Sequence, residues 1–387
     1  MSRGPSSPAA APAILARNIA DRLATLTYAE AEPASPTLGV YNLYGGAAGV
    51  AVFLAACSQH WRSDQYRGSV YRLLAEGALL GSDAAAYQST DASLCRGRAA
   101  AVYTLCYLAE CLDDLTLQDA ACRMLFAPGA LCPPGPADLD ALAGLAGLVI
   151  AVSRLASICP TGEVRNYLSA ITERLVRSAH RHGRVPGLGG PLAGFAHGLS
   201  GTAYALLSAY GVLRDDDIIE AVLRCLELEC AAYDPLLRDW PDFRASPARS
   251  SGAWCHGWPG VGLARCAAYG VPRLRPVVAR DLDRVLLLAV GAHLRVLDCL
   301  CCGNFGRVEL LAQLSAALGR PELDALGLGI ADLLCKRAMS REGFGEVRAA
   351  GQTPVGLFQG AAGYGYALLR ALAPTTVPSV LLFEVAR

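Results

Sequence analysis

The stretch FAHGLSGTAYALLSAY, residues 195–210, places a histidine and two glycines ahead of a long run of small and apolar residues. A helix that is apolar on nearly every side is buried between other elements. Gly198 and Gly201 give the pattern G-x-x-G, followed by a helix. The stretch therefore predicts an inner helix that begins directly after a glycine-bearing loop.

The same pattern recurs seven times along the chain. The first glycines of the copies are Gly46, Gly97, Gly144, Gly198, Gly257, Gly303 and Gly360. The second copy departs from the pattern, since Ala100 stands where the other copies have their second glycine. The intervals between first glycines, 46 to 59 residues, are long enough for two helices and two loops.

The segments between the copies are more polar. In PTGEVRNYLSAITERLVRSAH (160–180) and RPVVARDLDRVLLLAVGAHL (275–294), apolar residues recur at helical spacing, with Arg and Asp on the other face. We therefore predict an all-α fold, an α/α toroid in which seven inner helices are ringed by outer amphipathic ones. Repeats alone also allow an open solenoid. The paired glycines favour the ring, because they let helix N-termini crowd together around a centre.

The bulk composition excludes several classes of protein. Lys+Arg and Asp+Glu both number 34 in 387 residues, and a net charge of zero argues against nucleic acid as the main partner. The longest apolar run, residues 141–152, is too short to span a bilayer, so no transmembrane segment is expected. The start, MSRGPSSPAAAPAI, lacks the apolar core of a signal peptide. We predict a disordered leader over residues 1–14 and a single domain over residues 15–387.

The cysteines bear on the compartment. There are fifteen, scattered mostly inside apolar stretches, as at Cys106, Cys111, Cys225 and Cys266. Free cysteine behaves as a small buried hydrophobic residue, so most of these positions need no function. This usage predicts a cytoplasmic protein in which disulfides are not expected.

Polar chemistry is concentrated in the loops of the fourth, fifth and sixth copies. The residue directly before the first glycine is His197, His256 and Cys302 in these copies. One place earlier stand Cys255 in the fifth copy and Cys301 in the sixth. Small residues would suffice for packing at these positions, so the histidines and cysteines found there mark these loops as the candidate site.

The neighbouring Cys301 and Cys302 allow three interpretations. A disulfide would join Cα atoms about 3.8 Å apart, below the usual range that begins at about 4.4 Å, and would be strained. Two buried hydrophobic residues are the second interpretation. Cys255, in the matching position one copy earlier, adds a third thiol, and three thiolates suit Zn²⁺ with a fourth position left open. A closed structural site completed by His256 or His197 is the alternative form of that metal site.

These motifs resemble a known family. WCHGWPGVGLAR, LCCGNFG and the His-Gly of FAHGLSGTAYALL, on seven glycine-bearing repeats, resemble the LanC-like lanthipeptide cyclases over about residues 40–387. The ending GLFQGAAGYGYALLR…PSVLLFEVA is similar to the C-terminal cyclase domain of class II (LanM-type) lanthipeptide synthetases. The resemblance implies an α/α toroid with a central zinc. It also implies addition of a peptide cysteine thiol across dehydroalanine or dehydrobutyrine, which closes lanthionine or methyllanthionine rings.

By this resemblance the zinc ligands would be Cys255, Cys301 and Cys302. Many members of the family have Cys-His-Gly at the second motif, where this sequence has Cys-Cys-Gly. A three-cysteine subset of the class II-like enzymes is similar in this respect. A third thiolate places more negative charge on the zinc, so we expect a more nucleophilic substrate thiolate.

The resemblance also implies the acid–base residues. His197 matches the family histidine that handles the thiol proton or protonates the enolate, and imidazole suits both tasks because it titrates near neutrality. Asp140 matches a family carboxylate, which we expect to pair with His197. His256 follows the first ligand as in the class II-like W-C-H-G motif and is expected to support the site or donate a proton. Asp138 is expected to be a solvated loop residue.

The implied partner is a dehydrated precursor peptide. At 387 residues the chain leaves no room for the dehydratase domain of a full class II synthetase. We therefore expect a separate dehydratase and an exporter beside a stand-alone cyclase or an excised cyclase domain. Two alternatives stay open: a LanC-like protein that adds glutathione to dehydrated residues, and a non-catalytic peptide-binding scaffold whose zinc is structural.

Overall fold

The structure is a computed structural model that describes residues 8–32, 41–80, 91–127, 136–182, 192–341, 343–346 and 354–385. Within these residues the regular elements are helices, and the loops carry two isolated β-bridges, Asp234–Asp239 and Asp242–Arg249. No helix in these ranges is both long enough and apolar enough to cross a membrane.

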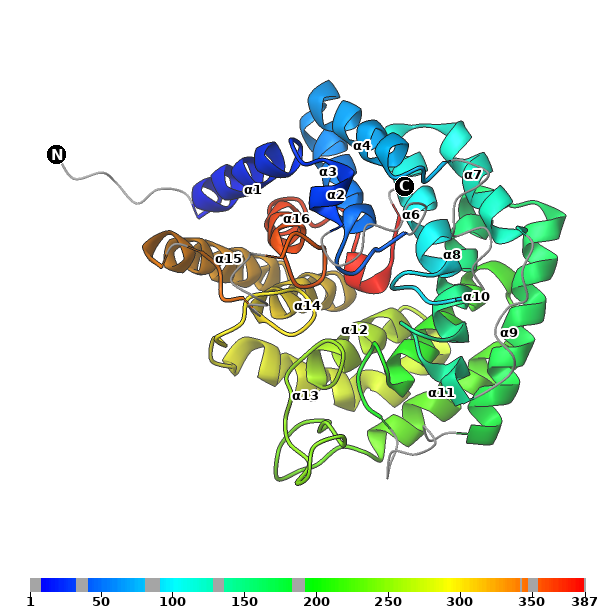
Figure 1. Cartoon of the computed structure of the whole chain (residues 1–387). Coiled ribbons are helices and arrows are strands. Elements are labelled where there is room, and N and C mark those ends of the chain that lie inside the picture. The colour runs from blue at the N-terminus through cyan, green and yellow to red at the C-terminus, as the bar shows by residue number, and fades with distance from the viewer. Residues whose placement is uncertain are drawn as a thin grey trace.

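Seven of the described helices begin directly after the first glycines of the sequence repeat, and each has that glycine at its N-cap. They are α3 (Ala47–Trp61), α6 (Arg98–Leu112), α8 (Leu145–Ile158), α10 (Leu199–Leu213), α12 (Trp258–Tyr269), α14 (Asn304–Leu318) and α16 (Ala361–Leu372). Each contacts the next in chain order, and α16 contacts α3, so together they close a ring (Figure 1).

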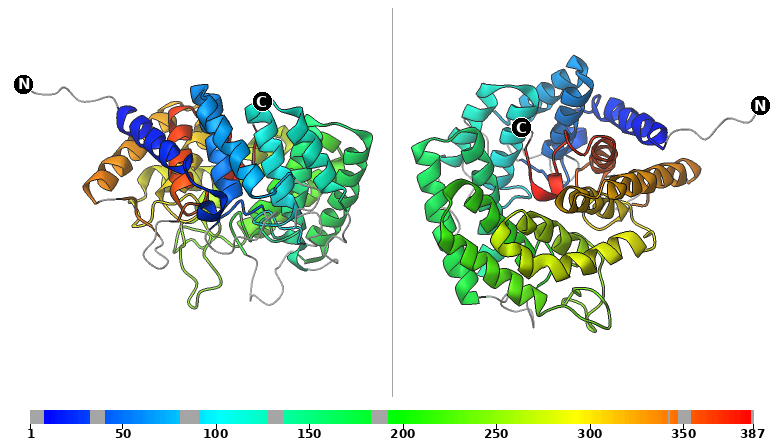
Figure 2. Two further views of the ribbon diagram at one scale, coloured as in Figure 1. Left: turned by 45° about the horizontal axis from the view of Figure 1, so that its top comes forward. Right: turned by 180° about the vertical axis from the view of Figure 1, so that it is seen from behind.

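A second helix packs against each of these seven in the described part of the chain. Six of the partners follow in sequence: α4 (Asp64–Glu76), α7 (Leu115–Leu125), α9 (Gly162–His182), α11 (Asp216–Cys230), α13 (Arg275–Gly291) and α15 (Glu322–Ser340). The partner of α16 is the N-terminal helix α1 (Ala10–Leu23), so the two ends of the chain complete the last repeat together (Figure 2). The predicted all-α toroid is the observed architecture.

The loops ahead of the seven glycine-capped helices are joined by a circle of backbone hydrogen bonds. Each loop donates an N–H to a carbonyl oxygen of its neighbour, at N–O distances of 2.8 to 3.2 Å. The pairs are Leu43 N–Cys95 O, Leu94 N–Leu142 O, Ala141 N–Ala196 O, Phe195 N–Trp254 O, Trp254 N–Cys301 O, Cys301 N–Phe358 O and Phe358 N–Tyr44 O. Because every loop both donates and accepts, the backbone at this end of the ring is satisfied and its spacing is fixed. The residues beside the first glycines are thereby gathered at one end of the molecule.

Glycine is required at these loops for steric reasons. A Cβ at Gly201 would collide with the carbonyl oxygen of Phe195, so only glycine lets the loop lie against the start of α10. Gly257 has a φ of +123°, which a residue with a side chain rarely adopts. The G-x-x-G pattern is thus the sequence signature of a loop folded back onto its own helix.

The C-terminal segment fills the centre of the ring (Figure 1). The short helix η3 (Val380–Leu382) accepts hydrogen bonds at its backbone from Trp254 Nε1, at 3.2 Å, and from Tyr204 Oη, at 2.6 Å. Phe383 is fully buried and packs against rings from four repeats, namely Tyr103, Phe195, Trp254 and Phe358. Through this aromatic packing, the loops ahead of the glycine-capped helices become part of the buried core.

The N-terminal boundary differs from the sequence expectation. Residues 10–14, assigned above to a disordered leader, belong to α1, whose buried residues include Pro12 and Ala16. Proline is tolerated in the first turn of a helix because no hydrogen bond is lost there. Residues 1–7 lie outside the described residues.

Candidate active site

The thiols predicted as metal ligands lie in two neighbouring loops. Cys255 precedes α12, and Cys301 and Cys302 precede α14. The Sγ atoms of Cys255 and Cys302 are 3.9 Å apart, and those of Cys301 and Cys302 are 2.9 Å apart. A tetrahedral zinc with Zn–S bonds of about 2.3 Å would hold its sulfur atoms about 3.8 Å apart. The separation between the two loops therefore matches the edge of such a site.

A further thiol, missed by the sequence analysis, lies in the same cluster. The Sγ atoms of Cys299, Cys301 and Cys302 all lie within 4.8 Å of one another. The signal was present in the sequence, because Cys299 and Cys302 form a C-x-x-C pair, a spacing typical of zinc sites. Cys255 joins this group through Cys302.

The surroundings of the thiols suit a cation. Hydrogen bonds from Cys255, Cys299 and Cys301 hold the pKa of the Cys302 thiol far below its ordinary value. Hydrogen bonds among the thiols, together with burial, raise the pKa values of Cys255 and Cys301. A thiolate ringed by thiol donors and largely shielded from water is a soft anionic site, so the donor set fits Zn²⁺.

Two side chains from the first and seventh repeats reach the cluster. The hydroxyl oxygen of Tyr44 lies 3.1 Å from Cys301 Sγ, and Gln359 Nε2 donates to the same sulfur at 3.5 Å. Burial raises the pKa of the Tyr44 hydroxyl well above its ordinary value, so it remains protonated. Both groups can donate to the sulfur once a metal has displaced its proton.

The structure brings His197 and Asp140 together, as expected. Nδ1 of His197 lies 2.7 Å from Oδ2 of Asp140, and both side chains are partly exposed. The other carboxylate oxygen accepts the backbone N–H groups of Leu142, at 2.8 Å, and Ala143, at 2.7 Å. The carboxylate is therefore fixed by its own loop and in turn fixes the imidazole ring.

His256 lies beside His197. Its ring stacks on that of His197, with centroids 5.2 Å apart and planes 24° apart. The residue is 1% exposed, and neither ring nitrogen has a hydrogen-bond partner in the structure. Burial, with the nearby charge of Arg244, lowers the pKa of His256 to about 4. A buried imidazole whose two nitrogens have no protein partner is unusual.

Asp138 differs from its expectation as a solvated loop residue. It is 4% exposed, and its carboxylate accepts hydrogen bonds from Arg174 Nε, at 3.1 Å, and Ser178 Oγ, at 2.8 Å. Both partners lie on α9, so Asp138 ties that outer helix to the loop that carries Asp140. It is a structural residue.

Comparison with known proteins shows the family of the chain. The model of the family described as "Lanthionine synthetase C-like protein" matches residues 39–382. The chain belongs to this family. Among curated proteins, this LanC-like chain is similar to the "Lacticin 481/lactococcin biosynthesis protein LcnDR2" of Lactococcus lactis subsp. lactis, at 29% identity over 189 residues. That match covers 46% of this chain and only 19% of the relative.

The fold of the LanC-like chain is also found among solved structures. It is similar to "Nisin cyclase" with a TM-score of 0.69 and 15% identity, and the match covers 96% of each chain. At this identity the likeness concerns the fold, and it supports the toroid described above.

One further charged pair faces the site of the LanC-like chain. Arg244 and Asp242, in the long loop between α11 and α12, are joined by hydrogen bonds of 2.7 and 2.9 Å. The hydrogen bond from Arg244 lowers the pKa of Asp242 to about 2, and the charges on Cys255 and Cys302 contribute to a raised pKa of Arg244. No repeat motif points to this pair, because both residues lie outside the glycine-bearing stretches of the repeat.

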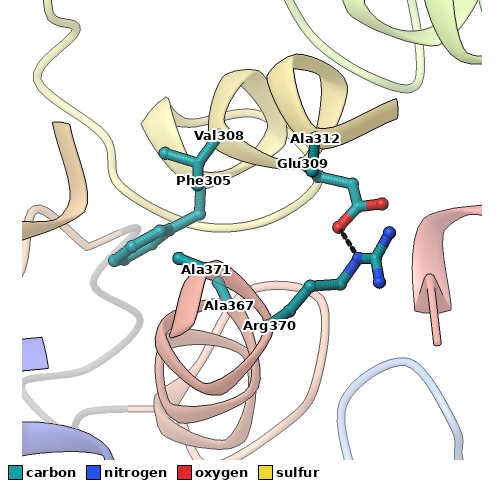
Figure 3. Close-up of a pocket in the computed structure, with 7 residues that line it drawn as sticks. All are labelled: Phe305, Val308, Glu309, Ala312, Ala367, Arg370 and Ala371. Carbon is teal, nitrogen blue, oxygen red and sulfur yellow. Dashed lines mark hydrogen bonds and ion pairs between the residues drawn. The ribbon is translucent and has the colours of Figure 1, made fainter. Parts of the chain in front are cut away.

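A small cavity between α14 and α16 lies in the bodies of the helices rather than at the loops that carry the thiols (Figure 3). Glu309 and Arg370 face each other beside it, with Oε2 and Nε 2.5 Å apart. Arg370 also donates to the backbone of the C-terminal segment at Pro374, at 2.9 Å. The ion pair therefore fastens this segment to the ring.

Proposed function

We propose that this protein is a zinc-dependent lanthipeptide cyclase. It adds cysteine thiols of a dehydrated precursor peptide to dehydroalanine or dehydrobutyrine and so forms (methyl)lanthionine thioether rings. The proposal rests on one observation above all: a thiol cluster and a histidine–carboxylate pair lie at the same end of a LanC-like ring.

Cys255, Cys301 and Cys302 would hold the zinc. Bound there, it would stabilise the thiolate of the peptide cysteine at neutral pH. The hydrogen bond from Gln359 and the contact with Tyr44 would hold Cys301 in place.

His197 would move the proton. Because the Asp140 carboxylate accepts a hydrogen bond from Nδ1, Nε2 is the nitrogen left to exchange protons. The imidazole takes the proton of the incoming thiol. Sulfur then bonds to the β-carbon of the dehydroamino acid, and the electron pair of the double bond moves toward its carbonyl group. His197 returns the proton to the α-carbon, so the product has the mass of the substrate.

His256 would support this reaction through its ring, which stacks on that of His197. Burial keeps its imidazole neutral at physiological pH, so it offers one N–H donor and one acceptor nitrogen without adding positive charge. His197 would thus transfer the proton, and His256 would hold the ring of His197 in place.

The compartment is part of the proposal. The fourteen cysteines in the described part of the chain are free thiols, which supports a reducing cytoplasm. A dehydratase acting beforehand would supply the dehydrated residues.

The test is incubation with a dehydrated peptide that contains cysteine. We expect loss of thiol alkylation at constant peptide mass, and a thioether link in fragment spectra. An alkylatable thiol that persists in the peptide, with transfer of glutathione to the dehydroamino acid instead, would favour the glutathione-adding alternative. Binding of the peptide without either product would favour the scaffold.

A further inference from the structure

The thiol cluster holds four sulfur atoms where the proposed function uses three. Cys299 is 1% exposed, and its Sγ lies within 4.8 Å of those of both Cys301 and Cys302. Other buried cysteines of this chain, such as Cys106 and Cys266, lie in the bodies of helices. Cys299 therefore differs from these cysteines because it lies in a loop, close to two other thiols.

The loop that carries Cys299 is closed on itself. The N–H of Gly303 donates to the carbonyl oxygen of Cys299 at 2.9 Å, and the N–H of Trp254 in the neighbouring loop donates to the carbonyl oxygen of Cys301 at 2.8 Å. These bonds fix the turn and hold it against the loop that carries Cys255. The position of the Cys299 thiol toward the cluster thus follows from the backbone of the turn.

Three of the four sulfur atoms are already near the spacing of zinc ligands. Sulfur atoms around a tetrahedral zinc are about 3.8 Å apart, and the three thiols lie within 4.8 Å. Shifts of about 1 Å or less, which include a widening of the 2.9 Å separation between the Sγ atoms of Cys301 and Cys302, would bring Cys299 to the spacing of a ligand. Zinc that has only three protein ligands takes a fourth from water or substrate, and a buried thiol at this range competes with water for that place.

We infer that Cys299 is a fourth ligand thiol, which fills the position of the metal site that the peptide thiol takes when it binds. This inference rests on the proposed function, because it assumes that zinc is held at Cys255, Cys301 and Cys302. The exchange would balance as follows: His197 takes the proton of the incoming thiol, Cys299 takes a proton from solvent as its sulfur leaves the metal, and Cys299 gives that proton back when it binds again. The resting site is then closed to water and opens only to a thiol.

X-ray absorption on the zinc-loaded protein counts the ligands directly. We expect four sulfur ligands in the resting wild-type protein. In Cys299→Ser we expect three sulfur ligands and one oxygen or nitrogen, with one zinc still bound per chain. Zinc should also pass to a competing chelator about tenfold faster in this variant.

Cys95→Ser is the matched control. Cys95 stands two places before Gly97, as Cys301 stands two places before Gly303, but in the second repeat. We expect the control to keep four sulfur ligands and the wild-type rate of zinc release. If Cys299→Ser does not fold, the same ligand count is measured on Cys299→Ala and on the wild-type protein.

A short peptide with one selenocysteine and no dehydroamino acid tests the exchange. We expect three sulfur ligands and one selenium ligand in the wild-type protein after its addition. Three sulfur ligands with water in the resting protein would overturn the inference and leave the cyclase proposal standing. Four sulfur ligands that never admit selenium would contradict the exchange and favour a structural zinc. Absence of zinc would overturn the metal assignment itself.

Discussion

Glu229 anchors the loop that carries His197, and its replacement by glutamine tests how that loop is held. The carboxylate is fully buried on α11. Oε1 accepts the N–H groups of Gly194 and Ser200, both at 3.0 Å, and these two residues flank His197. Oε2 accepts Ser200 Oγ at 2.5 Å and Arg265 Nη1 at 2.9 Å. All of these donors share the two carboxylate oxygens of Glu229, and Glu229→Gln replaces one of those oxygens with an NH₂ group.

The magnitude follows from the burial of the partners. An amide must turn its NH₂ group toward either the backbone N–H groups or Arg265, so donors face donors on one side. Removing one member of a buried ion pair costs about 3–5 kcal/mol. Arg265 keeps its second partner, Asp281, at 3.1 Å. We therefore expect a loss at the low end, about 3 kcal/mol in the free energy of unfolding.

Equilibrium unfolding in urea, followed by tryptophan fluorescence, measures this loss. Glu220→Gln is the control on the same helix, because Glu220 and its partner Arg273 are both 52% exposed at their side chains. We expect the control to change the free energy of unfolding by less than about 0.5 kcal/mol. A loss below about 1 kcal/mol in Glu229→Gln would refute the reasoning, since a buried pair would then behave like a surface pair.

Three further predictions follow from the structure. In thermal unfolding, Gly201→Ala should destabilise the protein by about 1–3 kcal/mol, because the added Cβ meets a backbone oxygen. Gly211→Ala, on the same helix, should stabilise it by about 0.5–1 kcal/mol, because no atom lies within 4 Å of the added Cβ. Asp140→Asn should slow ring closure by about 10²–10⁴-fold at an unchanged melting temperature, because His197 loses its orienting carboxylate; an unchanged rate in the alkylation assay would count against the pair. Cys302→His should keep one zinc per chain but close rings more slowly, and equal rates would show that the third thiolate has no kinetic role.

Much of the fold could be predicted because its repeat is local. Each first glycine stands at the N-cap of its helix, so counting back from the apolar runs placed all seven starts. The hydrogen-bond circle could not be predicted, since it joins loops that are far apart in sequence. The same holds for α1, which is assigned to the fold by its contact with α16 at the other end of the chain.

The site was predicted less completely. The pairing of His197 with Asp140 was expected from the family resemblance, and the structure places the two side chains in contact. Cys299 was overlooked although its spacing to Cys302 was visible in the sequence. Asp138 was misjudged because its partner Arg174 lies on another helix, 36 residues away. Arg244 lies in a long loop outside the repeat pattern, so only the fold relates it to the thiols.

The most direct test of the account is the rate of thioether formation as a function of bound zinc. The protein is stripped with a chelator, reloaded in steps, and given a dehydrated peptide that contains cysteine, while metal content and free peptide thiol are measured together. The account predicts no thioether without zinc and a rate that rises in proportion until one zinc is bound per chain. Equal rates in the stripped and reloaded protein, or a fully loaded protein that forms no thioether, would contradict it.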